Sequence, residues 1–288
     1  MTLWHIVVLA VIQGAAELLP VSSSAHVIVA SRLMGIKDIS SPQYMLMLVM
    51  LHTGTMFAVI AYFWKAWKRA VFSSTVSFYA FAIRVVVATV VTGVLGLGLK
   101  YGIEKYLAHS HPGTGKAEIE ELFGRLDLIA VSLAAVGILI IVSGLKSQRQ
   151  RERGTITIGD SVVIGAVQGL CLPFRGFSRS GATISAGLLR GVARIRLEEF
   201  SFALAVVLTP AVIWHEARRV FVHGQTSAVA VGMHDFLPSI LGMCFSFIAG
   251  LVALKILSRL LEKGQWWVFG VYCLAAAGGV YWMYTRGY

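Results

Sequence analysis

Long apolar runs separated by short polar stretches dominate the pattern of the chain. A helical membrane crossing needs roughly 20 mostly apolar residues. Six runs reach or approach this length, at residues 44–64, 78–99, 126–145, 200–214, 236–256 and 266–283. The fourth run is the shortest and contains Pro210. The pattern predicts an all-α polytopic membrane protein with six transmembrane helices.

Two further apolar regions, residues 3–34 and 161–189, are each interrupted midway by Pro, Ser, Gly and charged residues. Three of the six apolar runs follow each region. We interpret each interrupted region as a re-entrant helical hairpin, because irregular backbone is tolerated inside a membrane where it lines a polar cavity.

The two interrupted regions also resemble each other in sequence. Gln13-Gly14 corresponds to Gln168-Gly169, and Ser-Ser-Ser at residues 22–24 lies over Ser-Arg-Ser at residues 178–180, with one extra residue in the second copy. We therefore expect two repeats within one membrane domain, residues 1–145 and 146–288. Because three crossings separate the hairpins, the second repeat is expected to be inverted relative to the first.

Composition and charge favour the same interpretation. The chain is 57% apolar and only 14% charged, which is unusual for a soluble domain. Its formal net charge of +11 does not indicate nucleic acid, because the Lys and Arg residues lie in short loops rather than along one helix face. We expect membrane lipids and no nucleic acid as partners. The three cysteines lie in apolar surroundings without ligand spacing and are expected to pack.

Basic residues gather in the loops that a six-crossing topology places on one side. The positive-inside rule makes this side cytoplasmic and places both termini and the entrance of the first hairpin outside. Arg218 and Arg219 fall on the outer side and are exceptions. The basic residues on the inner side are Lys65, Lys68, Arg69, Lys146, Arg149, Arg151, Arg153, Lys255, Arg259 and Lys263.

The first hairpin carries Gln13 and Glu17, which lie four residues apart and so share one face of a helix. Both side chains can bind a hard cation. An ionisable group in a membrane segment costs about 2.5 to 3.5 kcal/mol for Asp on insertion scales, which makes a functional role the default. The alternative is a glutamate that reaches the interface or pairs with an arginine. We expect Glu17 and Gln13 to be metal ligands.

Pro20 is expected to end the helix that carries Glu17, because proline has no backbone donor. A new helix, expected over residues 26–33, then follows Ser22, Ser23 and Ser24, and its N-terminal amides, hydroxyls and macrodipole suit a phosphate. Simple helix capping is the alternative. His26 can accept a serine proton, bind a metal or only pack. The other histidines lack such polar neighbours in the sequence and are expected to be structural or solvated: His5, His52, His109, His111, His215, His223 and His234.

The second hairpin carries Arg175, Ser178, Arg179 and Ser180 ahead of a helix expected over residues 183–189, which Thr183 begins. A guanidinium stays charged when desolvated and presents a fixed fork to phosphate oxygens. Salt bridges to lipid head groups are the alternative. We expect these five side chains to bind phosphate together with the serines of the first hairpin. An acidic end and a cationic end then face each other, which suits a metal-bound pyrophosphate.

Three segments carry a resemblance to the undecaprenyl-pyrophosphate phosphatase family, also called bacitracin resistance proteins, over most of the chain. They are Gln13-Gly-Ala-Ala-Glu17-Leu-Leu-Pro-Val-Ser-Ser-Ser-Ala-His26, then Arg175-Gly-Phe-Ser-Arg-Ser-Gly-Ala-Thr183, and Glu199-Phe-Ser-Phe-Ala-Leu-Ala-Val206. The chain departs from the family pattern at Gln13, which stands at an acidic position. It departs again at Arg175, where the family usually has Pro, and at Ala25, where it usually has Gly.

The resemblance implies removal of the terminal phosphate of undecaprenyl pyrophosphate at the outer face of the bacterial inner membrane, which recycles the lipid carrier for peptidoglycan synthesis. It also implies that Glu17, Ser23, His26 and Arg179 take the functional positions. We expect Mg²⁺ or Ca²⁺ to bridge the phosphates, and either Ser23 or a metal-activated water to attack. The alternative is a polyprenyl-phosphate flippase, because inverted repeats with broken helices are typical of transporters. A homodimer remains open.

Overall fold

The computed structural model describes residues 2–36, 41–110, 119–149, 152–226 and 233–287. The described residues form helices and no strand beyond one isolated bridge between Arg153 and Val192. The prediction of an all-α protein is therefore confirmed. The helices are α1 (Leu3–Leu18), α2 (Ser23–Leu33), α3 (Pro42–Ala70), α4 (Thr75–Ser110), η1 (Ile119–Gly124), α5 (Leu126–Ser147), α6 (Ile158–Cys171), α7 (Arg179–Leu189), α8 (Arg194–Thr226), α9 (Met233–Glu262) and α10 (Trp267–Thr285).

Six of these helices, α3, α4, α5, α8, α9 and α10, are long and apolar enough to cross a membrane. They coincide with the six apolar runs and extend beyond most of their ends. Apolar side chains such as Val86, Val90, Val94 and Leu97 of α4 point out of the protein. Such a surface is unfavourable in water and suits contact with lipid tails. The chain is a multi-pass membrane protein. Pro210 lies inside α8 without ending it.

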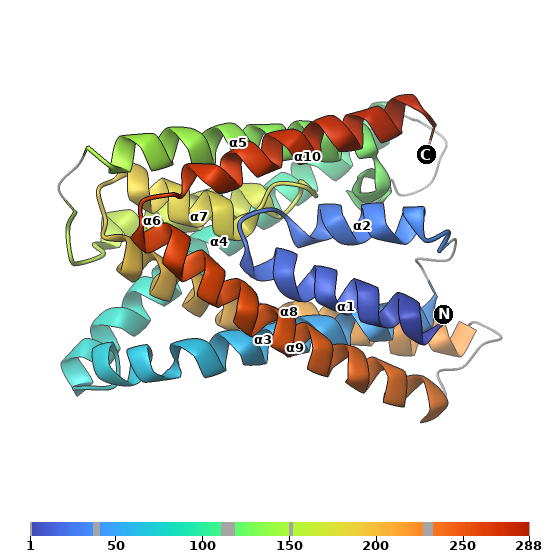
Figure 1. Cartoon of the computed structure of the whole chain (residues 1–288), viewed down its shortest axis with the longest axis horizontal. Coiled ribbons are helices and arrows are strands. Elements are labelled where there is room, and N and C mark those ends of the chain that lie inside the picture. Colours follow the sequence, from blue (N-terminus) through green and yellow to red (C-terminus); the bar gives the residue numbers. More distant parts are fainter. Residues whose placement is uncertain (1, 37–40, 111–118, 150–151, 227–232, 288) are drawn as a thin grey trace.

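The two interrupted regions each form a pair of short helices, α1 with α2 and α6 with α7. In Figure 1 the first pair extends from the end of the molecule where both termini lie, and the second pair extends from the opposite end. Their connecting turns meet near the middle. That each pair enters and leaves the bilayer on one side stays a prediction, and so does the division of the chain at residue 145.

The helix packing is repeated between the two halves. Helix α1 packs against α9, and its counterpart α6 packs against α4, while α3 packs on α8 and α5 on α10. Glycines allow α1 to approach α9 closely and α6 to approach α4 closely. A Cβ at Gly14 would lie 2.5 Å from the Ser246 carbonyl oxygen, and one at Gly165 would lie 2.4 Å from the Ala88 carbonyl oxygen. Small residues of this kind allow helix backbones to contact each other in membranes, and here they hold the inner helices in place.

Candidate active site

The turn of the first pair brings α2 back from the end of α1. Helix α1 ends at Leu18, and Pro20 follows at a position where a helix cannot continue. Ser22 has a φ of 70°, a conformation that non-glycine residues seldom adopt and that costs on the order of 1 to 3 kcal/mol. Its hydroxyl accepts a hydrogen bond from the Ala25 amide. Helix α2 therefore begins at Ser23, earlier than the sequence suggested.

The turn of the second pair is built in the same way. The Ser178 hydroxyl accepts a hydrogen bond of 3.2 Å from the Gly181 amide and caps α7. The helix begins at Arg179, directly after this cap, and so one turn earlier than the expected start at Thr183. Gly176 has a φ of 100°, and a Cβ there would lie 2.7 Å from the Ile129 carbonyl oxygen. Only glycine fits this close passage of the turn against α5.

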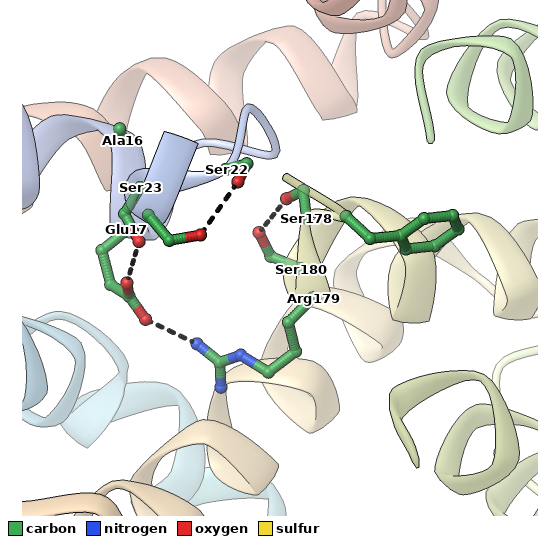
Figure 2. Close-up of a pocket in the computed structure, with 9 residues that line it drawn as sticks. Ala16, Glu17, Ser22, Ser23, Ser178, Arg179 and Ser180 are labelled. Carbon is green, nitrogen blue, oxygen red and sulfur yellow. Dashed lines mark hydrogen bonds and ion pairs between the residues drawn. The ribbon is translucent and has the colours of Figure 1, made fainter. Parts of the chain in front are cut away.

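The two turns contact each other and enclose a cavity of about 110 Å³, which we call the inter-hairpin cavity. The Ser180 hydroxyl donates a hydrogen bond of 3.5 Å to the Leu19 carbonyl oxygen of the first turn. Figure 2 shows the serines of both turns on opposite sides of the cavity. The residues that line it are Ala16, Glu17, Ser22, Ser23, Ser24, Phe177, Ser178, Arg179 and Ser180. All of these except Ala16 and Phe177 were predicted as site residues.

Glu17 and Arg179 form an ion pair across this cavity, with 3.1 Å between Arg179 Nη2 and Glu17 Oε1 (Figure 2). The other carboxylate oxygen accepts a hydrogen bond of 2.5 Å from the Ser23 hydroxyl. The side chains of Glu17 and Arg179 are only 17% and 22% exposed, so bulk water screens the pair poorly. A carboxylate, a hydroxyl and a guanidinium from both hairpins thus share one polar pocket.

Gln13 and His52 extend the acidic side of the site beyond the cavity lining. The Gln13 amide nitrogen lies 3.2 Å from Glu17 Oε2 and 3.1 Å from His52 Nδ1. The His52 nitrogen is itself 3.9 Å from Glu17 Oε2. The sequence around His52 gave no indication of these contacts, and the residue was expected to be structural or solvated. Its partners lie on α1, far from α3 in the sequence, so only the packing of the two helices reveals them.

Both ring nitrogens of His26 make contacts with groups other than the Ser23 hydroxyl. Its Nδ1 donates a hydrogen bond of 2.8 Å to the Ser22 carbonyl oxygen. A neutral imidazole then accepts at Nε2, which lies 2.7 Å from the Tyr272 hydroxyl. The two rings stack with 5.6 Å between their centroids. This geometry suits a residue that fixes the first turn.

Thr183 and Arg175 lie outside the set of residues that lines the inter-hairpin cavity. The Thr183 hydroxyl donates a hydrogen bond of 2.8 Å to the Arg179 carbonyl oxygen and lies 2.7 Å from the Ser201 hydroxyl. The Arg175 guanidinium stacks over the Phe123 ring at 4.4 Å from its centroid. A direct role for either side chain in phosphate binding stays a prediction.

The donor set on the acidic side fits a divalent cation. Among the described residues no three His, Cys, Asp or Glu side chains form a metal cluster, but Gln13 adds an amide that can offer its oxygen after a half-turn of the group. The carboxylate Oε2 of Glu17, this amide and His52 Nδ1 lie within 3.9 Å of one another. Oε2 also accepts the hydrogen bond from Ser23, and the other carboxylate oxygen is paired with Arg179.

Comparison with known proteins gives consistent results. A model of the family described as "Bacitracin resistance protein BacA" matches residues 6–279. The chain is 55% identical to "Undecaprenyl-diphosphatase 2" of Acinetobacter baylyi, with 97% of each chain covered. It is 32% identical to "Undecaprenyl-diphosphatase" of Desulfosudis oleivorans, with 97% of this chain and 98% of the relative covered. It is 30% identical to "Undecaprenyl-diphosphatase 2" of Burkholderia ambifaria, with 96% and 95% covered.

Proposed function

Because the chain belongs to the bacitracin resistance protein BacA family, we propose that it is an undecaprenyl-diphosphatase. It hydrolyses undecaprenyl pyrophosphate to undecaprenyl phosphate and inorganic phosphate. The observation that carries this proposal is the inter-hairpin cavity, in which Glu17 lies within hydrogen-bonding distance of Ser23 on its own hairpin and of Arg179 on the other.

The size of the cavity supports a head-group substrate. Small-molecule pockets commonly measure about 300 to 1,000 Å³, whereas this one measures about 110 Å³ and is lined mainly by polar side chains. A volume of this size is suited to a phosphate group and is far smaller than a polyprenyl chain. The chain of the lipid is therefore expected to lie along the apolar outer surface of the helices.

Anion binding falls to the cationic side of the cavity. Helices α2 and α7 both begin at the cavity, so their N-terminal amides and the positive ends of their dipoles face it. The Arg179 guanidinium adds a full charge with a geometry that suits two phosphate oxygens. These groups hold the pyrophosphate and offset the negative charge that develops as the phosphoanhydride bond breaks.

Ser23 is the proposed nucleophile. Its hydroxyl already donates to Glu17 Oε2, an oxygen that has a second lone pair for the proposed cation, so the carboxylate can orient Ser23 and take the proton as Oγ attacks the terminal phosphorus. The bond from that phosphorus to the bridging oxygen breaks, and undecaprenyl phosphate leaves. Water then cleaves the phosphoserine and releases phosphate. His26 keeps the first turn in place through the Ser22 carbonyl.

A divalent cation belongs to the proposal as well. Mg²⁺ or Ca²⁺ held by Glu17 and Gln13 would supply Lewis-acid stabilisation of the phosphate oxygens. Phosphate release is then expected to stop when EDTA removes the metal and to return when the metal is restored.

The test measures phosphate release from undecaprenyl pyrophosphate by purified protein in detergent. We expect Glu17→Ala and Ser23→Ala to lower kcat by about a thousandfold or more, while Ser74→Ala, on the exposed turn between α3 and α4, retains full activity. Near-normal turnover by Ser23→Ala would identify water as the nucleophile. Folded wild-type protein that releases no phosphate would refute the proposal and favour lipid transport.

We further propose that the chain lies in the bacterial inner membrane with the inter-hairpin cavity open to the outer side. The support is the basic character of the end of the molecule that lies opposite the two termini. There Arg153, Arg190 and Arg194 lie near the turns that lead into α6 and α8. In cells, a cysteine placed at Ser74 should resist an impermeant thiol reagent, whereas one placed at Thr2 should react. The reverse pattern would overturn this orientation.

A further inference from the structure

We propose that His52 is a third ligand of the metal site, and that its nitrogen shifts the preference of the site from Ca²⁺ towards first-row ions such as Mn²⁺ and Zn²⁺. This inference rests on the proposed function, because it concerns the cation that the phosphatase would use. It goes beyond the oxygen-only pair, Glu17 and Gln13, that the sequence indicates.

The geometry of three atoms carries the inference. Gln13 Nε2, Glu17 Oε2 and His52 Nδ1 form a triangle with sides of 3.1, 3.2 and 3.9 Å. A triangle of this size has a circumscribed radius of about 2.0 Å, so an ion just above its plane lies about 2.0 to 2.2 Å from all three corners, the range of zinc–nitrogen and zinc–oxygen bonds. The separations match those of adjacent ligands around a small divalent ion.

The hydrogen-bond pattern is compatible with metal binding, because Glu17 Oε2 accepts from the Ser23 hydroxyl and has a second lone pair for a cation. The Gln13 amide nitrogen points at both partners, so His52 Nδ1 must accept and therefore carries a lone pair. A half-turn of the Gln13 amide group places its oxygen at nearly the position of its nitrogen. The turn gives up the two hydrogen bonds of the amide nitrogen, and a bound cation would favour it. Two oxygens and one nitrogen then face the same point.

The surroundings hold these groups where a ligand set needs them. Gln13 is only 2% exposed, which restricts its side chain to this location. His52 reaches the site from α3, and Gly54 of the same helix allows close contact with α9, because a Cβ there would lie 2.3 Å from the Met243 carbonyl oxygen. The position of His52 is thus set by backbone packing and not by a flexible loop.

Ligand chemistry then predicts which ions bind. Ca²⁺ takes six to eight oxygen ligands and gains little from an imidazole. Imidazole nitrogen suits first-row transition ions, whose affinities rise from Mn²⁺ to later members of the series. The site contains only one carboxylate, so His52 contributes a large share of its affinity for the metal.

The test uses full-length protein in detergent with Mn²⁺ alone. Pulsed electron paramagnetic resonance of bound Mn²⁺ should show modulation from a directly bound ¹⁴N, and the signal should change in protein that contains ¹⁵N-histidine. Substitution His52→Gln should abolish the modulation and weaken Mn²⁺ binding by roughly tenfold to a hundredfold, with less effect on Ca²⁺. His5→Gln, at the outer end of α1, should change neither.

Each outcome separates this inference from the proposed function. Phosphate release with Mg²⁺ and no nitrogen coupling to bound Mn²⁺ would overturn the role of His52 and leave the phosphatase intact. Nitrogen coupling that survives in His52→Gln would also overturn it. Nitrogen coupling without phosphate release under any metal would instead refute the phosphatase and keep the metal site. The ¹⁵N experiment on wild-type protein keeps the test decisive if His52→Gln fails to fold.

Discussion

The ion pair between Glu17 and Arg179 joins the two hairpins, and a double-mutant cycle measures how strongly. The perturbations are Glu17→Gln and Arg179→Met, which keep most of the side-chain volume and remove the charges. Each single substitution leaves the partner charge with no counter-charge in a poorly solvated cavity, and we expect each to lower the free energy of unfolding by about 3 kcal/mol. The double substitution removes both charges and should cost less than the sum.

The expected coupling follows from the geometry. At 3.1 Å, an effective dielectric constant of 20 gives a Coulomb attraction of about 5 kcal/mol, which is an upper limit because both groups lose hydration. Neutral hydrogen bonds between membrane helices couple by about 0.6 kcal/mol on average, and hydrogen bonds to charged groups contribute about 1.5 to 3 kcal/mol. We therefore expect a coupling free energy of about 1.5 to 3 kcal/mol.

The assay is unfolding by sodium dodecyl sulfate in mixed micelles, followed by tryptophan fluorescence for the wild type, both single variants and the double variant. The Arg125 and Asp127 pair, whose arginine side chain is 55% exposed, is the matched control and should couple by no more than about 1 kcal/mol. Additivity within about 0.5 kcal/mol at Glu17 and Arg179 would show that the hairpins are not joined through this pair.

Three further predictions concern other parts of the structure. Gly165→Ala places a Cβ 2.4 Å from a carbonyl oxygen of α4 and should destabilise the protein by about 1 to 3 kcal/mol, whereas Gly93→Ala, with open space around it, should not. Burial opposes the charge of Asp160, but hydrogen bonds from its N-cap threonine and two arginines hold its pKa at about 2. The ionised Asp160 side chain therefore contributes to thermal stability above the ordinary carboxyl pKa, and this contribution is lost as the pH falls towards 2. The melting temperature of Asp160→Asn should depend less on pH in this range. Tyr272→Phe removes the hydroxyl next to His26 and should lower kcat by about tenfold or less with an unchanged pH profile, if His26 acts by position.

The fold could be predicted from the sequence because the bilayer imposes simple length and polarity rules. Each long apolar run had to become a helix, because a helix satisfies all the backbone hydrogen bonds of a single crossing segment within that segment. The helix starts at Ser23 and Arg179 were placed one turn too late, because the capping serines belong to runs of polar residues in which several positions can cap. The residues of α8 around Pro210 continue as helix where the composition alone suggested a short segment.

The candidate site was predictable in part, for a different reason. Polar residues inside a membrane segment are costly, so Glu17, Ser23 and Arg179 stood out in the sequence, and the structure brings them together. His52 did not stand out, because its neighbours in α3 are apolar and its partners lie on another helix. Tyr272 contacts His26 from α10, again through packing that no local pattern encodes.

The relation between the two hairpins explains how a repeated fold produces a single site of opposite charges. Ser22 and Ser178 cap their helices in the same way, so the residues that follow them, Ser23 and Arg179, occupy equivalent first positions of α2 and α7. Because the turns meet head to head, these equivalent positions face one cavity from opposite sides. Leu172 stands four residues after Gln168, where Glu17 stands four after Gln13. The second copy thus has no carboxylate to compete for its own arginine, and Arg179 is left to pair with Glu17 and, in the proposed reaction, with the phosphate that Ser23 attacks.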